Sequence, residues 1–283
     1  MIPVAFDYYA PTSVDEAVAL LREHDDAKVL AGGQSLMPVL RLRLAAPEVI
    51  VDVGRIEELN GIREDGDALV IGAMTPHSVV QADPLIAEHA RLISLATATI
   101  ADPQVRHRGT FGGSLAHADP AGDLPAVAVA LDAFFVIAGA TGRRTVGAAD
   151  FFEGVFSTAV GEDELLVEIR VPKYTGWGAH YEKFHRTAQA WATVAVAATV
   201  QRSNGSIGSA RVALTNMGPT PVRATRLEEA LAGCAADAAA IRAACAVAAQ
   251  GASPADDLTA SADYRRHLVR VLAARAVAAA AGV

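Results

Sequence analysis

The sequence has 283 residues, of which 52% are hydrophobic but only 5% aromatic, so we expect two or three subdomains with cores of small side chains. Its formal charge of -8 argues against nucleic-acid binding, which usually needs a basic surface. No apolar run approaches the roughly 20 residues that a transmembrane helix requires. The N-terminal residues MIPVAFDYYAP do not resemble a signal peptide, and we therefore expect a cytoplasmic protein.

Residues 1–55 predict a small α/β unit. An S-x-x-E capping box begins at Ser13, and the apolar residues that follow at helical spacing predict a helix to about His24. Short apolar runs at 28–30 and 49–53 predict two strands. The first of these strands leads directly into a Gly-Gly pair, which indicates a turn.

Residues 56–173 predict hairpins and helices. Hairpins are expected on either side of Asp65-Gly66 and of Thr141-Gly142. Helices are predicted at 76–81, 84–100 and 124–131. A further strand is predicted at 165–171, directly before a proline.

Residues 174–283 predict three antiparallel strands followed by alanine-rich helices. The strands are expected at 178–185, 192–201 and 207–215, and the helical region begins near Arg226. Strands and helices therefore occur in blocks, which is typical of an α+β fold. We expect three units, with bounds 1–55, 56–173 and 174–283.

Two segments repeat the same unusual pattern, a Gly-Gly pair followed within two residues by serine: VLAGGQSLM at 29–37 and GTFGGSLAH at 109–117. Glycine lets the backbone turn sharply and approach a ligand closely, and successive amides can then surround a phosphate. One such pair is more often an ordinary turn, but two favour a grip on the pyrophosphate of a dinucleotide from opposite sides. The sequence contains neither G-x-G-x-x-G nor G-x-x-x-x-G-K-[ST], so a Rossmann fold and a P-loop are disfavoured.

No metal site is expected in this chain. Its two cysteines, Cys234 and Cys245, are too few for an iron–sulfur cluster and do not have the spacing of a zinc site.

Three stretches resemble the flavin-binding subunit of molybdenum hydroxylases: AGGQSLMPVLRLRLAAPEVIVDV, IADPQVRHRGTFGGSLAHADPAGDLPAV and ELLVEIRVP. The sequence is most similar to medium subunits of aerobic-type carbon monoxide dehydrogenases, and more distantly to xanthine dehydrogenase flavin domains. The resemblance extends from Phe6 to the C-terminal YRRHLVRVLAARAV. It implies a PCMH-type, vanillyl-alcohol-oxidase-like FAD-binding fold of two α/β subdomains. A C-terminal domain, with a three-stranded antiparallel sheet and helices, would close over the flavin.

The resemblance also implies a set of FAD contacts, in which both glycine segments wrap the pyrophosphate and no residue is catalytic. The expected cofactor-binding residues are Ala31, Gly32, Gly33, Gln34, Ser35, Leu36, Ile100, Ala101, Thr110, Gly112, Gly113, Ser114, His117, Asp119, Asp123, Leu165, Lys183 and Trp191.

Several of these positions keep a second interpretation. Asp123 is expected to contact FAD through its adenosine side, to cap the following helix, or both. Leu165 is either an apolar contact of FAD or an ordinary strand-core residue. Lys183 is expected near the pyrimidine end of the flavin, where a cation would stabilise the negative charge of reduced flavin. Trp191 lies either against the isoalloxazine, where some relatives carry Tyr, or packed in the C-terminal domain.

Further positions near the flavin follow from the same resemblance. Ile100 and Ala101 are expected against the isoalloxazine. For His117 and Asp119, a hydrogen-bonding role around FAD is favoured over an acid–base pair. Relatives among the carbon monoxide dehydrogenases often have Asn where this chain has Ser114 and His117, which leaves the substrate open.

The implied function is electron transfer. A large subunit with molybdopterin would oxidise the substrate, a small subunit with 2Fe-2S clusters would pass the electrons on, and FAD in this chain would deliver them to an external acceptor. We expect a dimer of such heterotrimers, and a quinone acceptor would bring it to the membrane surface. The alternatives are the flavin subunit of a xanthine or N-heterocycle dehydrogenase, and a self-sufficient flavoprotein reductase. The sequence leaves open whether the substrate is carbon monoxide, a purine or another N-heterocycle, and whether the acceptor is quinone, oxygen, NAD or another compound.

Overall fold

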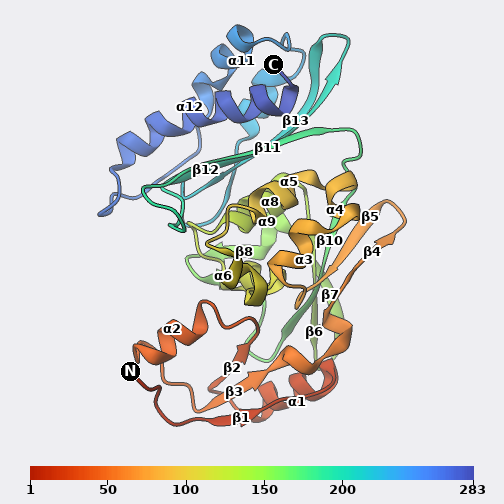
Figure 1. Cartoon of the computed structure of the whole chain (residues 1–283), viewed down its shortest axis with the longest axis vertical. Helices are drawn as coiled ribbons and strands as arrows, with labels where there is room; N and C mark the ends of the chain where they lie inside the picture. Colours follow the sequence, from red (N-terminus) through yellow and green to blue (C-terminus); the bar gives the residue numbers. More distant parts are fainter.

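Three main sheets follow one another along the long axis of the molecule (Figure 1). The computed structural model describes all residues, 1–283. The strand order is β1-β3-β2 in the N-terminal sheet, β4-β5-β10-β6-β7 in the middle sheet and β11-β12-β13-β14 in the C-terminal sheet, and β8 pairs with β9. The strands are β1 (Asp7–Tyr9), β2 (Ala27–Leu30), β3 (Val49–Asp52), β4 (Ile62–Asp65), β5 (Ala68–Gly72), β6 (Phe134–Gly139), β7 (Gly142–Gly147), β8 (Phe152–Gly154), β9 (Ser157–Thr158), β10 (Leu165–Pro172), β11 (Gly178–Phe184), β12 (Val194–Ser203), β13 (Ser206–Thr215) and β14 (Val222–Arg223).

Helices cover these sheets and connect them, as the α+β prediction requires. The α-helices are α1 (Val14–Glu23), α2 (Leu36–Arg41), α3 (His77–Ala82), α4 (Pro84–His89), α5 (Arg91–Thr97), α6 (Pro103–Arg108), α7 (Phe111–His117), α8 (Asp123–Ala130), α9 (Ala148–Phe151), α10 (Thr225–Leu231), α11 (Ala238–Ala244) and α12 (Ala262–Ala281). Three short 3-10 helices are η1 (Val53–Arg55), η2 (Glu57–Leu59) and η3 (Cys245–Val247). No helix has the length and apolarity to span a membrane.

The N-terminal sheet is parallel, because β1 and β2 both pair in the same direction with β3. Helix α1 begins where the capping box predicts, with the Ser13 hydroxyl accepting from the amide of Glu16 at 3.2 Å. The Glu16 carboxylate accepts from the amide of Thr12 at 2.8 Å, one residue before the cap, so the box closes over a slightly longer span than expected.

The middle sheet contains both predicted hairpins, β4–β5 and β6–β7. Strand β10 lies between β5 and β6 and is antiparallel to both, so it completes the sheet from a distant part of the sequence. The single helix expected at 84–100 is wrong: α4 ends at His89 and α5 starts at Arg91, because Ala90 leaves the helical conformation with a φ of -145°.

The C-terminal sheet contains the three predicted strands as β11, β12 and β13, and the two-residue β14 extends its edge. Side chains on β12 alternate between its faces, as strand geometry requires. Val194, Val196 and Ala198 belong to the core under α12, whereas Ala195 and Ala197 belong to the core shared with the middle sheet. The face toward the middle of the molecule is thus lined by alanine, which allows a close approach.

Helix α8 packs against this alanine-lined face of the C-terminal sheet. All of its residues are buried, and it packs both in the core of the middle sheet and against strands of the C-terminal sheet. The helix expected at 124–131 is therefore confirmed, and it is the main apolar connection between these two parts of the molecule.

Candidate functional site

The two glycine segments touch each other. A Cβ added to Gly32 would lie 2.2 Å from the carbonyl oxygen of Arg108 and 2.7 Å from the Cα of Gly109. A Cβ added to Gly113 would lie 3.4 Å from the Cβ of Ala31. Segments that are more than seventy residues apart in the sequence thus form one continuous surface, as a shared phosphate site would require.

The first glycine segment carries backbone amides without partners. No amide from Ala31 through Leu36 donates a hydrogen bond within the chain, and most of these residues are only half-buried. Gly33 has a φ of +73°, a left-handed conformation that glycine adopts at little cost. Consecutive free amides around such a turn form a concave donor surface, which suits a phosphate.

The second glycine segment is helical and not a sharp turn with free amides, so that part of the prediction is wrong. It forms the first turn of α7, with the Thr110 hydroxyl accepting from the amide of Gly113 at 3.2 Å. The amides of Phe111 and Gly112 donate to the carbonyls of Thr75 and Ala73, both at 2.9 Å. These contacts outweigh the low helix propensity of two glycines.

Glycine at position 112 serves close packing rather than ligand binding through the backbone. A Cβ there would lie 2.5 Å from the Cβ of Ala73, so only glycine lets α7 lie against the end of β5. The amide of Ser114 donates to the carbonyl of Thr110 at 3.1 Å, which leaves only its half-buried side chain to face a ligand. The two segments therefore differ: the first offers amides and the second braces it.

His117 and Asp119 follow at the end of α7 and do not bond to each other. The His117 ring packs on Phe156, with ring centroids 5.0 Å apart, and burial lowers the pKa of His117 although the nearby Asp119 opposes this. The Asp119 carboxylate instead accepts from the amide of Ala121 at 2.8 Å. The structure therefore holds no acid–base pair here, and a hydrogen bond from either residue to FAD stays a prediction.

Ile100 and Ala101 lie half-buried in the turn between α5 and α6. Ala101 has a φ of +38°, which is unusual for a residue with a Cβ, and such strain collects at functional sites. The Arg106 guanidinium donates to the carbonyl of Ile100 at 2.7 Å and holds this turn.

Asp123 and Lys183 form a buried ion pair. Their side chains are each only 4% exposed, and the Lys183 ammonium lies 2.8 Å from the Asp123 carboxylate. Tyr181 donates to the other carboxylate oxygen at 2.7 Å, and Lys183 also donates to the carbonyl of Thr99 at 3.2 Å. Burial raises the pKa of Asp123, against the opposing effect of the Lys183 charge.

The ion pair bears on two predictions: that Asp123 caps helix α8, and that the charge of Lys183 stabilises reduced flavin. The N-cap of α8 is Gly122, and the Asp123 side chain bonds to the C-terminal sheet, so the capping role is wrong. The charge of Lys183 is already balanced inside the protein. Its expected effect on reduced flavin stays a prediction, and so does a contact of Asp123 with FAD.

Leu165 and Trp191 have opposite surroundings. Leu165 is buried among residues of the N-terminal and middle sheets, as a strand-core residue, and its contact with FAD stays a prediction. Trp191 is 59% exposed in the loop between β11 and β12, so the alternative in which it packs in the C-terminal domain is wrong. Its aromatic face is free to meet a ring.

We expect Trp191→Ala to shift the absorption spectrum or the midpoint potential of bound flavin while most of the FAD content is retained. The reason is that an aromatic side chain beside the ring would exclude water and alter the relative stability of its redox forms. Spectra and redox titrations of variant and parent, both reconstituted with FAD, measure this. Trp177→Ala is the control, because Trp177 packs on Tyr174. Unchanged spectrum and potential in a folded, flavin-replete Trp191→Ala protein would remove Trp191 from the ring.

His77 is a residue of this site that the sequence did not predict. Its amide donates to the carbonyl of Gly109 at 2.9 Å, and Pro76 bridges Thr110, so this turn supports the start of the second glycine segment. The ring is buried, and its Nδ1 has no hydrogen-bond partner. Nothing local in the sequence marks His77, because its role arises from contact with a segment some thirty residues away.

We expect His77 to make folding sensitive to acid. Burial, with a smaller effect of the Arg106 charge, lowers the pKa of His77 from 6.5 to about 4. Between these values the unfolded chain binds a proton that the folded chain does not, so the free energy of unfolding falls as the pH falls. The expected loss is about 3 kcal/mol between pH 6.5 and 4.

Urea unfolding at several pH values tests this, with His77→Gln as the variant and the exposed His107→Gln as its control. His77→Gln should remove most of that pH dependence, and His107→Gln should leave it. An equal acid dependence in parent and His77→Gln would contradict the assignment.

The geometry defines a class of protein first. An amide-lined turn, braced by a second glycine segment at the meeting of α/β units, is a site for the phosphates of a nucleotide cofactor. The chain belongs to the family described as FAD binding domain in molybdopterin dehydrogenase, which matches residues 4–174, and residues 179–280 match the CO dehydrogenase flavoprotein C-terminal domain. It is thus an FAD-binding oxidoreductase subunit with the expected PCMH-type fold and C-terminal flavoprotein domain.

Individual relatives agree with this family. The chain is 45% identical over 284 residues to the carbon monoxide dehydrogenase medium chain of Hydrogenophaga pseudoflava, with 99% of this chain and 98% of the relative covered. A solved structure of carbon monoxide dehydrogenase from that organism, lacking the Mo-pyranopterin moiety, has a TM-score of 0.95 at 47% identity and covers 99% of this chain and 98% of its own. Quinoline 2-oxidoreductase from Pseudomonas putida 86 has a TM-score of 0.95 at 33% identity and covers 100% of this chain and 99% of its own.

Proposed function

We propose that this chain holds one noncovalent FAD with its pyrophosphate on the amides of residues 31–36. The observation that carries this proposal is the row of unpartnered amides in contact with the Gly109 turn. Gly33 supplies the backbone conformation, and Ser35, Thr110 and Ser114 supply hydroxyl groups around it. Ile100, Ala101, Lys183 and Trp191 would line the flavin side.

The described residues fit such a cofactor. Amide donors without partners would bind phosphate oxygens, and glycine at 32 keeps the backbone of the two segments in contact. Bound FAD supplies one- and two-electron redox chemistry, and the protein supplies position and electrostatics. The buried Lys183–Asp123 pair holds the turn at Thr99 through the hydrogen bond from Lys183 to the Thr99 carbonyl. The exposed Trp191 would exclude water from the isoalloxazine ring of the flavin.

We infer a division of labour among three units with bounds 1–55, 56–173 and 174–283. The first provides the amide-lined turn, the second provides the supporting helix α7, and the third covers the flavin with the β11–β12 loop. The three main sheets support this division, because each is formed within one of these ranges.

Within a complex, we propose that this chain is the electron-transfer subunit of a molybdenum hydroxylase. It would take electrons from 2Fe-2S clusters of a small subunit, supplied by a large molybdopterin subunit, and deliver them to an external acceptor. A dimer of heterotrimers in the cytoplasm is the assembly we favour. A quinone acceptor would bring this assembly to the membrane surface without a spanning helix.

Carbon monoxide is the substrate that we propose for the complex, because the 45% identical relative is a carbon monoxide dehydrogenase medium chain over nearly its full length. A second candidate is an N-heterocycle, supported by the equal TM-score of 0.95 with quinoline 2-oxidoreductase. The substrate itself would bind to the large subunit, so the residues of this chain do not decide between the two.

Copurification and anaerobic reduction test this proposal together. The chain, tagged and expressed with the products of its neighbouring genes, should copurify with a large and a small subunit. Carbon monoxide should then bleach the flavin absorption of the complex, and quinoline should not. Bleaching by quinoline alone would favour the second candidate. Oxidation of the substrate by the isolated chain at the rate of the complex would overturn the subunit assignment.

A further inference from the structure

Helix α8 is attached to the C-terminal sheet by an acidic residue at each end. Asp123 at its first position bonds to Tyr181 and Lys183 on β11. Asp132, just beyond its last turn, bonds to Arg211 on β13 and to Arg223 at the end of β14. The first anchor is buried and belongs to the site described above. The second lies at the other end of the helix and has no part in that site.

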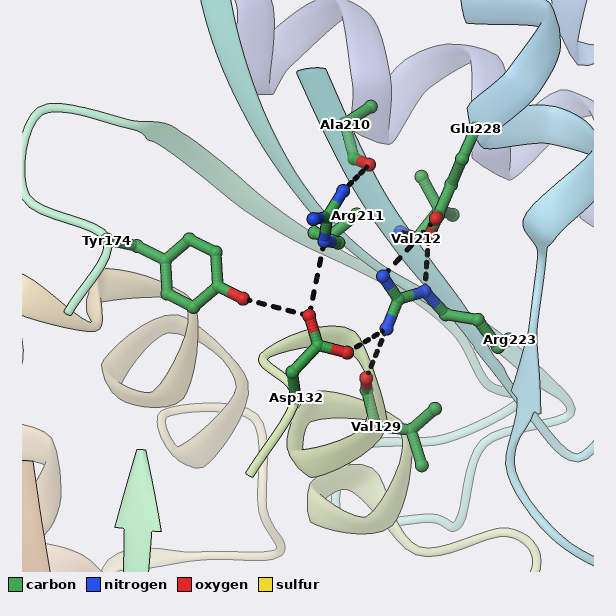
Figure 2. Close-up of polar contacts among 8 residues, drawn as sticks. All are labelled: Val129, Asp132, Tyr174, Ala210, Arg211, Val212, Arg223 and Glu228. Atoms are coloured by element: carbon green, nitrogen blue, oxygen red, sulfur yellow. Dashed lines mark hydrogen bonds and ion pairs between the residues drawn. The ribbon is translucent and has the colours of Figure 1, made fainter. Parts of the chain in front are cut away.

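Asp132 accepts from three donors at once (Figure 2). One carboxylate oxygen accepts from Arg223 Nη1 at 2.7 Å. The other accepts from Arg211 Nε at 3.2 Å and from the Tyr174 hydroxyl at 3.3 Å. Both arginines belong to the C-terminal sheet, and Tyr174 belongs to the connection between β10 and β11. Asp132 is therefore the single acceptor on which the sheet and its connecting segment converge.

The surrounding contacts fix the position of Arg223. The same Nη1 donates to the carbonyl of Val129 in the last turn of α8 at 2.7 Å. Glu228 on α10 pairs with the guanidinium of Arg223 and also accepts from the amide of Val212 at 2.7 Å. The negative charge of Glu228 reduces the repulsion between the two arginines. The Arg223 side chain is thus held by Glu228 on one side and by Val129 and Asp132 on the other. The Tyr174 hydroxyl donates to Asp132, and burial raises its pKa to about 12.

The backbone at Asp132 ends helix α8 in a left-handed conformation. Its φ is +49°, the left-handed conformation in which helices commonly end. Glycine is the usual residue there, because a Cβ makes this conformation unfavourable. Aspartate tolerates this conformation better than most residues with a Cβ, and here it also places a carboxylate between two arginines.

The two anchors together restrict how the C-terminal sheet can turn on α8. At the near anchor, Lys183 bridges Asp123 and the carbonyl of Thr99, next to the Ile100–Ala101 turn. The apolar packing of α8 against β12 and β13 already holds the sheet, and the two polar anchors add to it at the ends of the helix. A small pivot of the sheet would shift Lys183 against that turn, and the second anchor, at the far end of the helix, opposes such a pivot.

We propose that Asp132 is a positioning residue that fixes the C-terminal sheet over the flavin site through both ends of α8. This inference rests on the proposed placement of the flavin beside the Ile100–Ala101 turn and the β11–β12 loop. Asp132 touches no cofactor, and it acts only through the orientation of β11 and the residues that β11 carries.

The experiment compares FAD release from the reconstituted parent chain with release from Asp132→Asn, Asp132→Glu and Asp65→Asn. Asp65 is a matched control, because its side chain is 53% exposed and that of Asp132 is 49% exposed. Asp65 also pairs with an arginine, Arg170, but within the middle sheet. The rate of release is followed by the rise in flavin fluorescence, and visible circular dichroism of the bound flavin reports its surroundings.

Asp132→Asn should release FAD about fivefold faster or more, the lower end of typical coupling between sites, with an altered visible dichroism spectrum. Asp65→Asn should behave as the parent does, and Asp132→Glu, which keeps the charge, should recover most of the parental rate and spectrum. Parental release and spectrum in flavin-replete Asp132→Asn would overturn this inference alone, as would equal acceleration in Asp65→Asn. A parent chain that binds no FAD would overturn the proposed function as well.

Discussion

Gly33→Val is expected to abolish FAD binding while the protein remains folded. Gly33 has a φ of +73°, where a residue with a Cβ costs about 1–2 kcal/mol and β-branched valine more, and the neighbours of its Cβ, Met37 Cγ at 3.1 Å and Leu30 Cδ1 at 3.3 Å, are side chains that can move, so the fold should survive. The branched side chain would also lie beside the free amides of the turn and prevent a phosphate from approaching them closely. Flavin absorbance relative to protein absorbance after reconstitution measures the loss.

Gly205→Val provides the matched control for this substitution. Gly205 has a φ of +79° and open space around it, in the turn between β12 and β13, so the backbone strain is comparable but the position lies away from the glycine segments. The control should keep its FAD. Full flavin content in a folded Gly33→Val protein would mean that this turn does not face the pyrophosphate.

The same loss of FAD is expected from Gly113→Val in the second glycine segment. Its Cβ would lie 2.6 Å from the Thr110 hydroxyl oxygen and in ordinary contact, at 3.4 Å, with the Cβ of Ala31, so the two methyl groups that valine adds beyond Cβ would crowd the contact between the two segments. Because the closest atom is the end of a side chain that can rotate, the fold should survive.

Asp123→Ala is expected to have the largest effect on stability of any single substitution considered for this chain. It would leave the Lys183 ammonium buried without its partner, and breaking a buried ion pair typically costs about 3–5 kcal/mol. The double variant Asp123→Ala with Lys183→Met should recover part of that loss, because no charge is then buried without a partner, although the Tyr181 hydroxyl and the Thr99 carbonyl still lose theirs. Urea denaturation with a constant m-value gives the free energies of unfolding.

The exposed pair Arg226–Glu229 serves as the control for burial. Its side chains are 68% and 63% exposed, and Glu229→Ala should cost less than about 1 kcal/mol, since water screens such pairs. The role of the buried pair would be contradicted if Asp123→Ala cost no more stability than Glu229→Ala does. It would also be contradicted if the double variant were less stable than Asp123→Ala alone.

Local patterns were sufficient to predict much of the fold. The hairpins β4–β5 and β6–β7 follow from alternating residues around short turns, and α1 follows from its capping residue and apolar spacing. The insertion of β10 between β5 and β6 joins residues far apart in sequence, and no local pattern encodes that pairing. The break at Ala90 was missed because alanine favours helix, and only the packing of α4 and α5 requires the chain to turn there.

The site was predicted less evenly. Two Gly-Gly pairs, each followed within two residues by serine, indicated that two distant segments act together, and the contact of Gly32 with the Gly109 turn agrees with that. Their similar patterns hid the difference between them. Thr110 and the carbonyls of Ala73 and Thr75 occupy the amides of the second segment, and that depends on tertiary neighbours that the motif does not contain.

The acidic residues of α8 show a further limit of sequence reasoning. Asp123 before an apolar run has the pattern of a helix cap, but Tyr181 and Lys183 on a distant strand take its carboxylate. Asp132 gave no signal at all, because its three donors come from the connection to β11 and from β13 and β14.

The most direct test of the central claim is a measurement of the flavin bound by the purified chain after reconstitution. We predict about one FAD per chain, all of which appears in the supernatant after acid precipitation, because the site holds the cofactor by hydrogen bonds from backbone amides and no covalent link. A chain that binds no FAD, or one whose yellow colour stays with the washed protein pellet, would contradict this account.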